Sequence, residues 1–206
     1  MTQEERNQRT RDRIMAAARK EFGDNSYEAA SINTICAAEG LSKGLLYHHF
    51  KDKDDLYLTC VQECFEHLLS YMGQQIPSSF SANIDRDLAR YFQIRLTFFQ
   101  QYPDEQKIFF RAMLTPPQHL AEELTKLRKP VEDFNRRTLA SILKNTELRP
   151  GITIEEVSDL ELILQNYANS RPAMYDTALG DIIAHENMCL RWIELLLYGV
   201  VQTSPK

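Results

Sequence analysis

A glycine turn followed by a very short apolar segment, residues 40–53, constrains the fold of this chain more than any other feature. The segment reads GLSKGLLYHHFKDK. It predicts a turn at Gly40, a very short helix from Ser42, and a further helix that begins at Lys53. A helix this short is not stable by itself in water, so neighbouring helices must hold it in place. Together with the preceding segment, Ser31–Ala38, it predicts a helix-turn-helix.

The outer side of this short helix has a chemistry suited to DNA. Ser42 stands where an N-cap is expected, and Lys43 offers a charged donor for guanine or phosphate. Gly44 costs about 1 kcal/mol of helix stability relative to alanine, a cost that is tolerable where a partner must approach the backbone. Leu45 could contact a thymine methyl group. The alternative is an ordinary turn between two surface helices, because this geometry also occurs in proteins that never bind nucleic acid.

The segment from Ile14 to Leu56 resembles the DNA-binding domain of the TetR family of bacterial transcriptional regulators. The matching positions are Ile14, Ala17, Ala18, Phe22, Ser31, Ile32, Ile35, the turn 38–42, the signature Leu46-Tyr47-His48-His49-Phe50, Lys53 and Leu56. Ser26 and Cys36 depart from the family pattern, which often has glycine and alanine there. The resemblance implies an all-helical homodimer that binds a palindromic operator and releases it when a small ligand binds the C-terminal domain.

The same resemblance assigns roles to individual residues. It implies base-edge contacts from Lys43, Gly44 and Leu45, with Asn33 as a further candidate. Phosphate contacts are expected from Ser31, Tyr47, His49 and Lys53, whereas His48 faces either the DNA or the domain interior. The DNA-binding set that we predict is therefore Ser31, Asn33, Ser42, Lys43, Gly44, Leu45, Tyr47, His48, His49 and Lys53.

Composition and charge agree with a helical regulator. The chain has 206 residues, and sustained alternation of apolar and polar residues is absent, so we expect an all-α fold. The net charge of −5 is concentrated outside the first 53 residues, which hold nine Lys/Arg and eight Asp/Glu. Arginines 6, 9, 11 and 13 either form a solvated helix end or contact phosphates. With no membrane-spanning run and no secretion signal, a cytoplasmic location is expected.

We predict two domains, a helix-turn-helix DNA-binding domain in residues 1–52 and a larger helical ligand-binding and dimerisation domain in residues 53–206. The helices expected in the second domain are 53–72, 83–101, 104–115, 118–145, 153–169 and 181–198. Pro130 should kink or split the helical region that contains it. The helices 153–169 and 181–198 are apolar on more than one face, which predicts a four-helix homodimer interface. Alternatively, they are core helices of a monomer.

Aromatic residues are unusually frequent in the middle helices, with polar groups among them. This pattern predicts a small-molecule cavity, although a tightly packed core is an alternative. The ligand-binding candidates are Tyr91, Arg95, Phe98, Phe99, Phe109, Phe110, Met113, Asn135 and Tyr167. Among them, Arg95 would favour an anionic or carbonyl-bearing ligand.

The remaining residues with reactive side chains suggest no catalysis. Cys60, Cys64 and His67 could bind a metal or sense redox state, but both thiols lie in an apolar stripe typical of buried structural cysteines. Motifs of phosphate-binding loops, metalloproteases and serine hydrolases are absent. We therefore expect no enzymatic activity, no cofactor and no metal. A helical enzyme or an adaptor that does not bind DNA stays the alternative.

Overall fold

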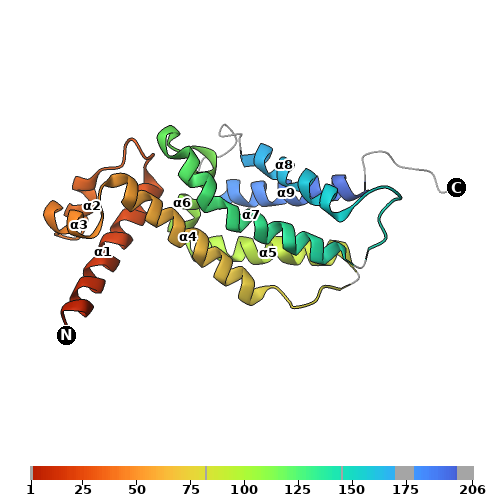
Figure 1. The fold of residues 1–206 in the computed structure, drawn as a ribbon, viewed down its shortest axis with the longest axis horizontal. Coiled ribbons are helices and arrows are strands. Elements are labelled where there is room, and N and C mark those ends of the chain that lie inside the picture. Colours follow the sequence, from red (N-terminus) through yellow and green to blue (C-terminus); the bar gives the residue numbers. More distant parts are fainter. Residues whose placement is uncertain (1, 82, 145, 170–178, 199–206) are drawn as a thin grey trace. The chain divides into compact units, whose positions relative to one another are not determined.

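The computed structural model describes residues 2–81, 83–144, 146–169 and 179–198, and every regular element in these ranges is helical (Figure 1). The expected all-α fold is therefore confirmed. In chain order the helices are α1 (Gln3–Asp24), α2 (Ile32–Ala38), α3 (Lys43–His49), α4 (Lys53–Gln75), α5 (Ile84–Gln101), α6 (Pro103–Leu114), the short 3₁₀ helix η1 (Gln118–Leu120), α7 (Ala121–Leu143), α8 (Ile154–Asn169) and α9 (Leu179–Tyr198). None of the described helices is long and apolar enough to cross a membrane.

Packing divides the chain into two compact units. The first contains residues 1–67 and 101–128, and the second contains residues 68–100 and 129–206. The first unit thus includes α6, η1 and the beginning of α7 in addition to the N-terminal helices. The domain division that we predicted at residue 52 follows the resemblance to DNA-binding domains rather than packing, and it stays a prediction.

Helix α1 organises the first unit. Thr2 and Glu5 form a capping box at its beginning, which satisfies two of the backbone N–H groups that have no partner inside a helix. Its buried face carries Ile14, Ala18 and Phe22, and it packs against α2 and α6. The Cβ that any other residue would add at Gly23 lies only 3.2 Å from Lys107 Cβ. The glycine therefore permits the close approach of α1 and α6.

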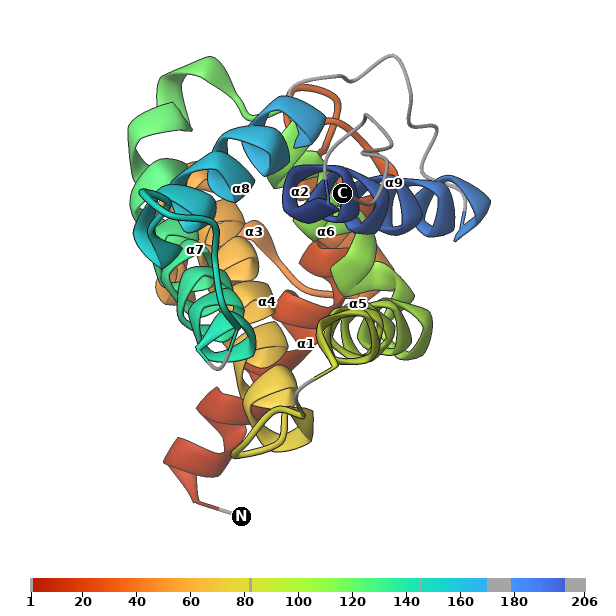
Figure 2. The same cartoon turned by 90° about the vertical axis from the view of Figure 1, so that its right-hand side faces the viewer.

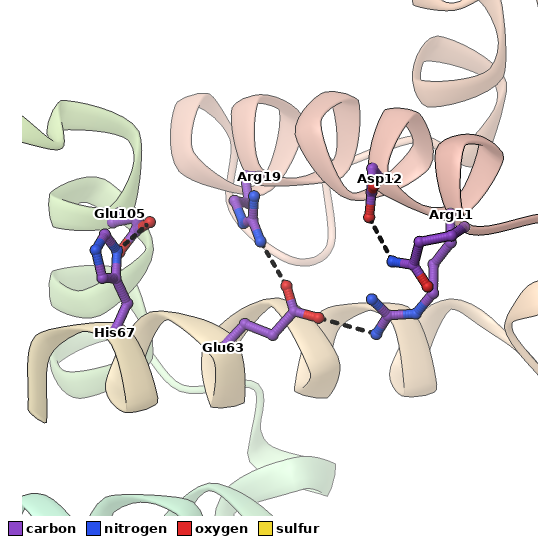
Figure 3. Close-up of polar contacts among 7 residues, drawn as sticks. Arg11, Asp12, Arg19, Glu63, His67 and Glu105 are labelled. Carbon is purple, nitrogen blue, oxygen red and sulfur yellow. Dashed lines mark hydrogen bonds and ion pairs between the residues drawn. The ribbon is translucent and has the colours of Figure 1, made fainter. Parts of the chain in front are cut away.

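Polar contacts lock α1 to α4 and α6. The carboxylate of Glu63 on α4 accepts hydrogen bonds from Arg11 at 2.9 Å and from Arg19 at 2.5 Å, both on α1 (Figure 3). Arg111 on α6 donates to the backbone carbonyl of Gly23 at 2.7 Å. The side chain of Glu63 is only about one quarter exposed, so this bridge is shielded more than an ordinary surface ion pair. The first unit is therefore held together by these polar contacts as well as by its apolar core.

The second unit is formed by α5, α7, α8, α9 and the end of α4. Figure 2 shows α7, α8, α9 and α5 following one another around this unit. Pro130 lies inside α7, which remains one helix, so the predicted split at this residue does not occur. Pro130 is exposed, at a position where its ring meets solvent. The predicted ranges of the last two helices agree with α8 and α9 to within two residues.

Candidate functional site

The helix-turn-helix is built by two serine caps and one glycine turn. Ser31 accepts a hydrogen bond from the backbone N–H of Asn33 at 3.2 Å, and Ser42 accepts one from that of Leu45 at 3.2 Å. Between them, Gly40 has a φ of 61°, in the left-handed region that favours glycine. The N–H of Leu41 donates to the carbonyl of Cys36 at 2.8 Å and closes the turn. These local signals are the ones that predicted the motif.

Helix α3 divides cleanly into an inner and an outer side. Leu46 is fully buried and Phe50, which follows the helix, is 3 % exposed. These two residues anchor the helix in the first unit. The outer side presents Lys43, Leu45 and Tyr47 to solvent, and the two apolar side chains among them are 37 % and 47 % exposed. Exposed leucine and tyrosine beside a lysine form a surface suited to a partner.

Gly44 lies on this outer side, and the fold does not require it. A Cβ built there would meet only the hydroxyl oxygen of Ser42, at 3.9 Å, and Gly44 does not have a positive φ. Alanine would therefore fit without strain and would favour the helix. The glycine leaves the backbone of α3 open to approach from outside.

The two adjacent histidines differ in their surroundings. His48 is exposed, so the alternative that it faces the interior is not what the structure shows. His49 is partly buried, and its Nε2 atom is shielded from solvent without a hydrogen-bond partner among the described residues. Burial lowers the pKa of His49, and the neighbouring His48 and Arg11 lower it further. Of the pair, His48 is thus the freer to meet a phosphate.

Lys53 begins α4 beside the same surface, where an aromatic ring holds it. Its Nζ atom lies 4.4 Å from the centroid of the Tyr27 ring, a cation–π contact. The hydroxyl of Tyr27 donates a hydrogen bond to Asp54, and this bond is the main cause that lowers the pKa of Asp54. His119 also contacts Asp54, at 3.2 Å. The ammonium group is therefore held against the Tyr27 ring rather than left to swing freely.

Two of the N-terminal arginines have internal partners. Arg11 pairs with Glu63, and Arg13 donates to the side chain of Glu39 at 2.9 Å and to its backbone carbonyl at 2.5 Å. Arg9 is exposed. The structure thus favours a structural role for Arg11 and Arg13 over the phosphate-binding alternative.

The predicted ligand-binding residues do not form one group. Phe109, Phe110 and Met113 lie on α6 in the first unit, whereas the other six belong to the second unit. Phe109 packs edge-on against Phe65, with ring centroids 5.4 Å apart, as part of a core. Two of the nine, Tyr91 and Asn135, line one cavity of the second unit.

This cavity lies among four helices of the second unit. Its lining residues are Leu88, Tyr91, Asn135, Thr138, Leu139, Ile142, Glu161 and Ile193, and the space between them has room for about one water molecule. Our sequence reasoning missed Glu161 because a glutamate on an amphipathic helix normally faces solvent. Only the packing of α8 against its neighbours leaves this side chain 8 % exposed.

Arg95 does not line that cavity, and its charge is already matched. Its Nε atom lies 3.2 Å from a carboxylate oxygen of Glu186, and each of the two side chains is 3 % exposed. The expectation that Arg95 would favour an anionic ligand therefore loses its basis. A buried ion pair of this kind is costly to break, because either partner alone would be an uncompensated charge.

Helices α8 and α9 pack against each other and expose apolar side chains on their outer faces. On α8, Leu160, Ile163 and Tyr167 are 47 %, 62 % and 47 % exposed and follow helical spacing. Ile183 of α9 is 36 % exposed. Ile182, another predicted interface residue, has a side chain outside the described set. Three large apolar residues thus lie exposed in one stripe on α8.

All four cysteines are free and buried. Burial raises the pKa of Cys60 to about 12 and raises that of Cys64 well above its usual value. His67 contacts the carboxylate of Glu105 at 2.9 Å (Figure 3). Within the described residues no group of histidine, cysteine and acidic side chains could hold a metal ion. Cys60 and Cys64 thus lie in the core, where the apolar stripe of their helix placed them.

The chain is similar in sequence to known regulators. Residues 14–60 match the family model described as bacterial regulatory proteins, tetR family. The transcriptional repressor AcnR of Corynebacterium efficiens is 28 % identical over 121 residues, which cover 58 % of this chain and 63 % of that protein. The transcriptional regulator UidR of Escherichia coli K12 is 38 % identical over 69 residues, covering 34 % of this chain and 35 % of UidR. The chain thus matches less than two thirds of the length of these relatives.

Solved structures resemble the chain over a longer range. The fatty acid degradation regulator FadR of Bacillus halodurans has a TM-score of 0.67 at 15 % identity, covering 92 % of this chain and 95 % of that one. FadR of Bacillus subtilis, solved in complex with stearoyl-CoA, has a TM-score of 0.67 at 18 % identity, with 92 % and 98 % coverage. At such identities the likeness concerns the fold alone.

Proposed function

Because this chain belongs to the tetR family of bacterial regulatory proteins, we propose that it is a cytoplasmic repressor that binds a palindromic operator as a homodimer and is released by a small molecule. The family consists of regulatory proteins, so we assign the chain no enzymatic activity. The alternative is a helical enzyme or an adaptor that does not bind DNA. It would not explain the composition of α3.

One observation carries the DNA-binding proposal, namely the outer side of α3. Lys43, Gly44 and Tyr47 are exposed on a helix of seven residues whose first turn is capped by Ser42. The N-terminal residues of such a helix are those that reach base edges in the major groove. Because alanine would fit at Gly44, the glycine is best explained by a partner that approaches the backbone.

The homodimer proposal rests on the exposed stripe of α8. Leu160, Ile163 and Tyr167 would be removed from water if α8 and α9 packed against their copies in a second subunit. A two-fold dimer of this kind presents two α3 helices to successive major grooves, about 34–36 Å apart or a multiple of that distance. A palindromic operator follows from this symmetry.

The release proposal rests on the cavity of the second unit and on helix α4. This helix begins with Lys53 in the first unit and continues without a break to Gln75 in the second. A ligand releases the operator only if it binds better to a dimer whose α3 helices do not fit the DNA. By linkage, operator DNA must then weaken ligand binding by the same factor.

The decisive experiment is selection of DNA fragments by the purified protein, followed by gel shifts with the enriched sequence. We expect a site of two inverted half-sites. The double variant Lys43→Ala/Tyr47→Ala should lose specific binding, whereas Lys129→Ala, which removes an exposed lysine of the second unit, should not. Full specific binding by the double variant would refute the assignment of α3 as the recognition helix.

A further inference from the structure

Glu161 is a buried carboxylate that no described residue satisfies with a hydrogen bond. It projects from α8, is 8 % exposed, and lines the cavity of the second unit. Burying a carboxylate without a hydrogen-bond partner is costly. A carboxylate in this position at a cavity wall is available to accept a hydrogen bond from an occupant.

Other polar groups at this wall already pair with each other. The hydroxyl of Tyr91 donates to Oδ1 of Asn135 at 2.6 Å. The amide nitrogen of Asn135 in turn donates to Oε1 of Gln165 at 3.2 Å. Thr138 adds one neutral hydroxyl to the lining. The hydroxyl of Tyr91 and one of the two amide N–H donors of Asn135 are thus occupied, and neither residue donates a hydrogen bond to Glu161.

Glu161 shares its nearby cations with other carboxylates. The cations that act on it are Arg95 of α5 and Arg136 of α7. Arg95 lies 3.2 Å from Glu186 of α9, and Arg136 lies 2.9 Å from Asp159 of α8. Each arginine therefore has another acidic partner, and the ring of His185 also lies 3.5 Å from Glu186, so Glu161 has no cation to itself among the described residues and a cationic ligand suits this wall better than an anionic one.

A second cavity approaches the same carboxylate from another side. Glu161 lines it together with Leu164, Gln165, Cys189, Trp192 and Ile193, and this space also has room for about one water molecule. Glu161 and Ile193 belong to both linings. The acceptor therefore lies between two largely apolar spaces.

We propose that Glu161 binds the ammonium group of an apolar amine, whose hydrocarbon part lies against Leu88, Leu139 and Ile142. A charge-assisted hydrogen bond from the ammonium group would satisfy the carboxylate in a medium where such bonds are strong. The aliphatic walls would take the rest of the molecule out of water. That such an amine also releases the operator rests on the proposed function above.

Two further observations describe how an amine would act at this position. Burial raises the pKa of Glu161 to about 7, so near neutral pH the site can exchange a bound proton for an ammonium group. The cavity is also narrow, so an occupant larger than a water molecule must spread the helices around it. A ligand that changes the packing of the second unit is one that can select a different dimer conformation.

The test compares three eight-carbon ligands on the full chain without DNA: octylamine, octanoate and 1-octanol. Isothermal titration calorimetry at pH 8, where Glu161 is mainly ionised and octylamine is protonated, gives each Kd. We expect octylamine to bind about 10- to 100-fold more tightly than octanoate and 1-octanol. Glu161→Gln should lose this preference. Glu155→Gln, an exposed position in the first turn of α8, should keep it.

Several outcomes would overturn the proposal: no measurable binding of octylamine, equal binding of octylamine and octanoate, or unchanged octylamine affinity in Glu161→Gln. The ligand comparison uses the wild-type chain, so it stays decisive even if the Glu161 variant folds poorly. Operator binding is measured separately by gel shift. Failure of the amine with intact operator binding would reject Glu161 as the ligand-binding residue and leave the DNA-binding role standing.

Discussion

Replacing Gly44 by alanine separates stability from DNA binding more sharply than any other change in this chain. The added Cβ would lie 3.9 Å from the hydroxyl oxygen of Ser42, an ordinary van der Waals distance, so the folded protein can accept it. Removing a helical glycine raises stability by up to about 1 kcal/mol, and by less in the first turn of a helix, where Gly44 lies. The free energy of unfolding should therefore stay equal or rise slightly.

Operator affinity should move in the opposite direction. If the backbone of α3 lies against base edges, a methyl group at residue 44 lifts it away and weakens the neighbouring contact of Lys43, which we expect to cost about 1–3 kcal/mol. Urea unfolding followed by circular dichroism measures the stability, and fluorescence anisotropy with labelled operator measures the affinity at a fixed salt concentration.

Two glycines elsewhere provide the controls for this variant. Gly73→Ala changes an exposed position of α4 that has no atom within 4 Å of the new Cβ, so it should raise stability and leave operator affinity unchanged. Gly23→Ala should lower stability because its Cβ meets Lys107 at 3.2 Å. If Gly44→Ala binds the operator like the wild type, or if it unfolds as readily as Gly23→Ala, the reasoning about Gly44 is wrong.

Three further predictions concern other parts of the molecule. Lys53→Ala should weaken binding to all DNA sequences alike and reduce the slope of log K against log salt by about 1, measured by anisotropy over a salt series; an unchanged slope would exclude a phosphate contact. Ile163→Glu places a charge in the exposed stripe of α8 and should give a monomer in light scattering at micromolar concentration, and a wild-type monomer under the same conditions would refute the dimer. Glu161 has a folded pKa of about 7 against 4.5 in the unfolded chain, so the folded state binds the additional proton between these values. Acidification from pH 8 to pH 5 should therefore stabilise the wild type by up to roughly 3 kcal/mol relative to Glu161→Gln, and parallel pH profiles of the two proteins in urea unfolding would contradict the pKa shift.

The recognition motif could be predicted because its determinants are local. Ser31 and Ser42 cap helices through backbone groups within three residues of them, and Gly40 adopts the left-handed conformation that its turn requires. The periodicity of apolar residues likewise predicted α8 and α9 to within two residues. Such features depend on neighbours along the chain, so the order of residues is enough to identify them.

The grouping of the ligand-site residues and the burial of Glu161 depended on segments that are distant in the sequence. The sequence by itself determined an all-helical chain with a capped recognition helix, but it placed Phe109 and Phe110 with Tyr91 in one ligand site, whereas packing assigns α6 to the first unit. It also gave no sign of Glu161, whose neighbours Arg95 and Arg136 are brought to it from other helices. Desolvation depends on every segment that covers a side chain, including those far away in the sequence, and only the tertiary structure brings those segments together.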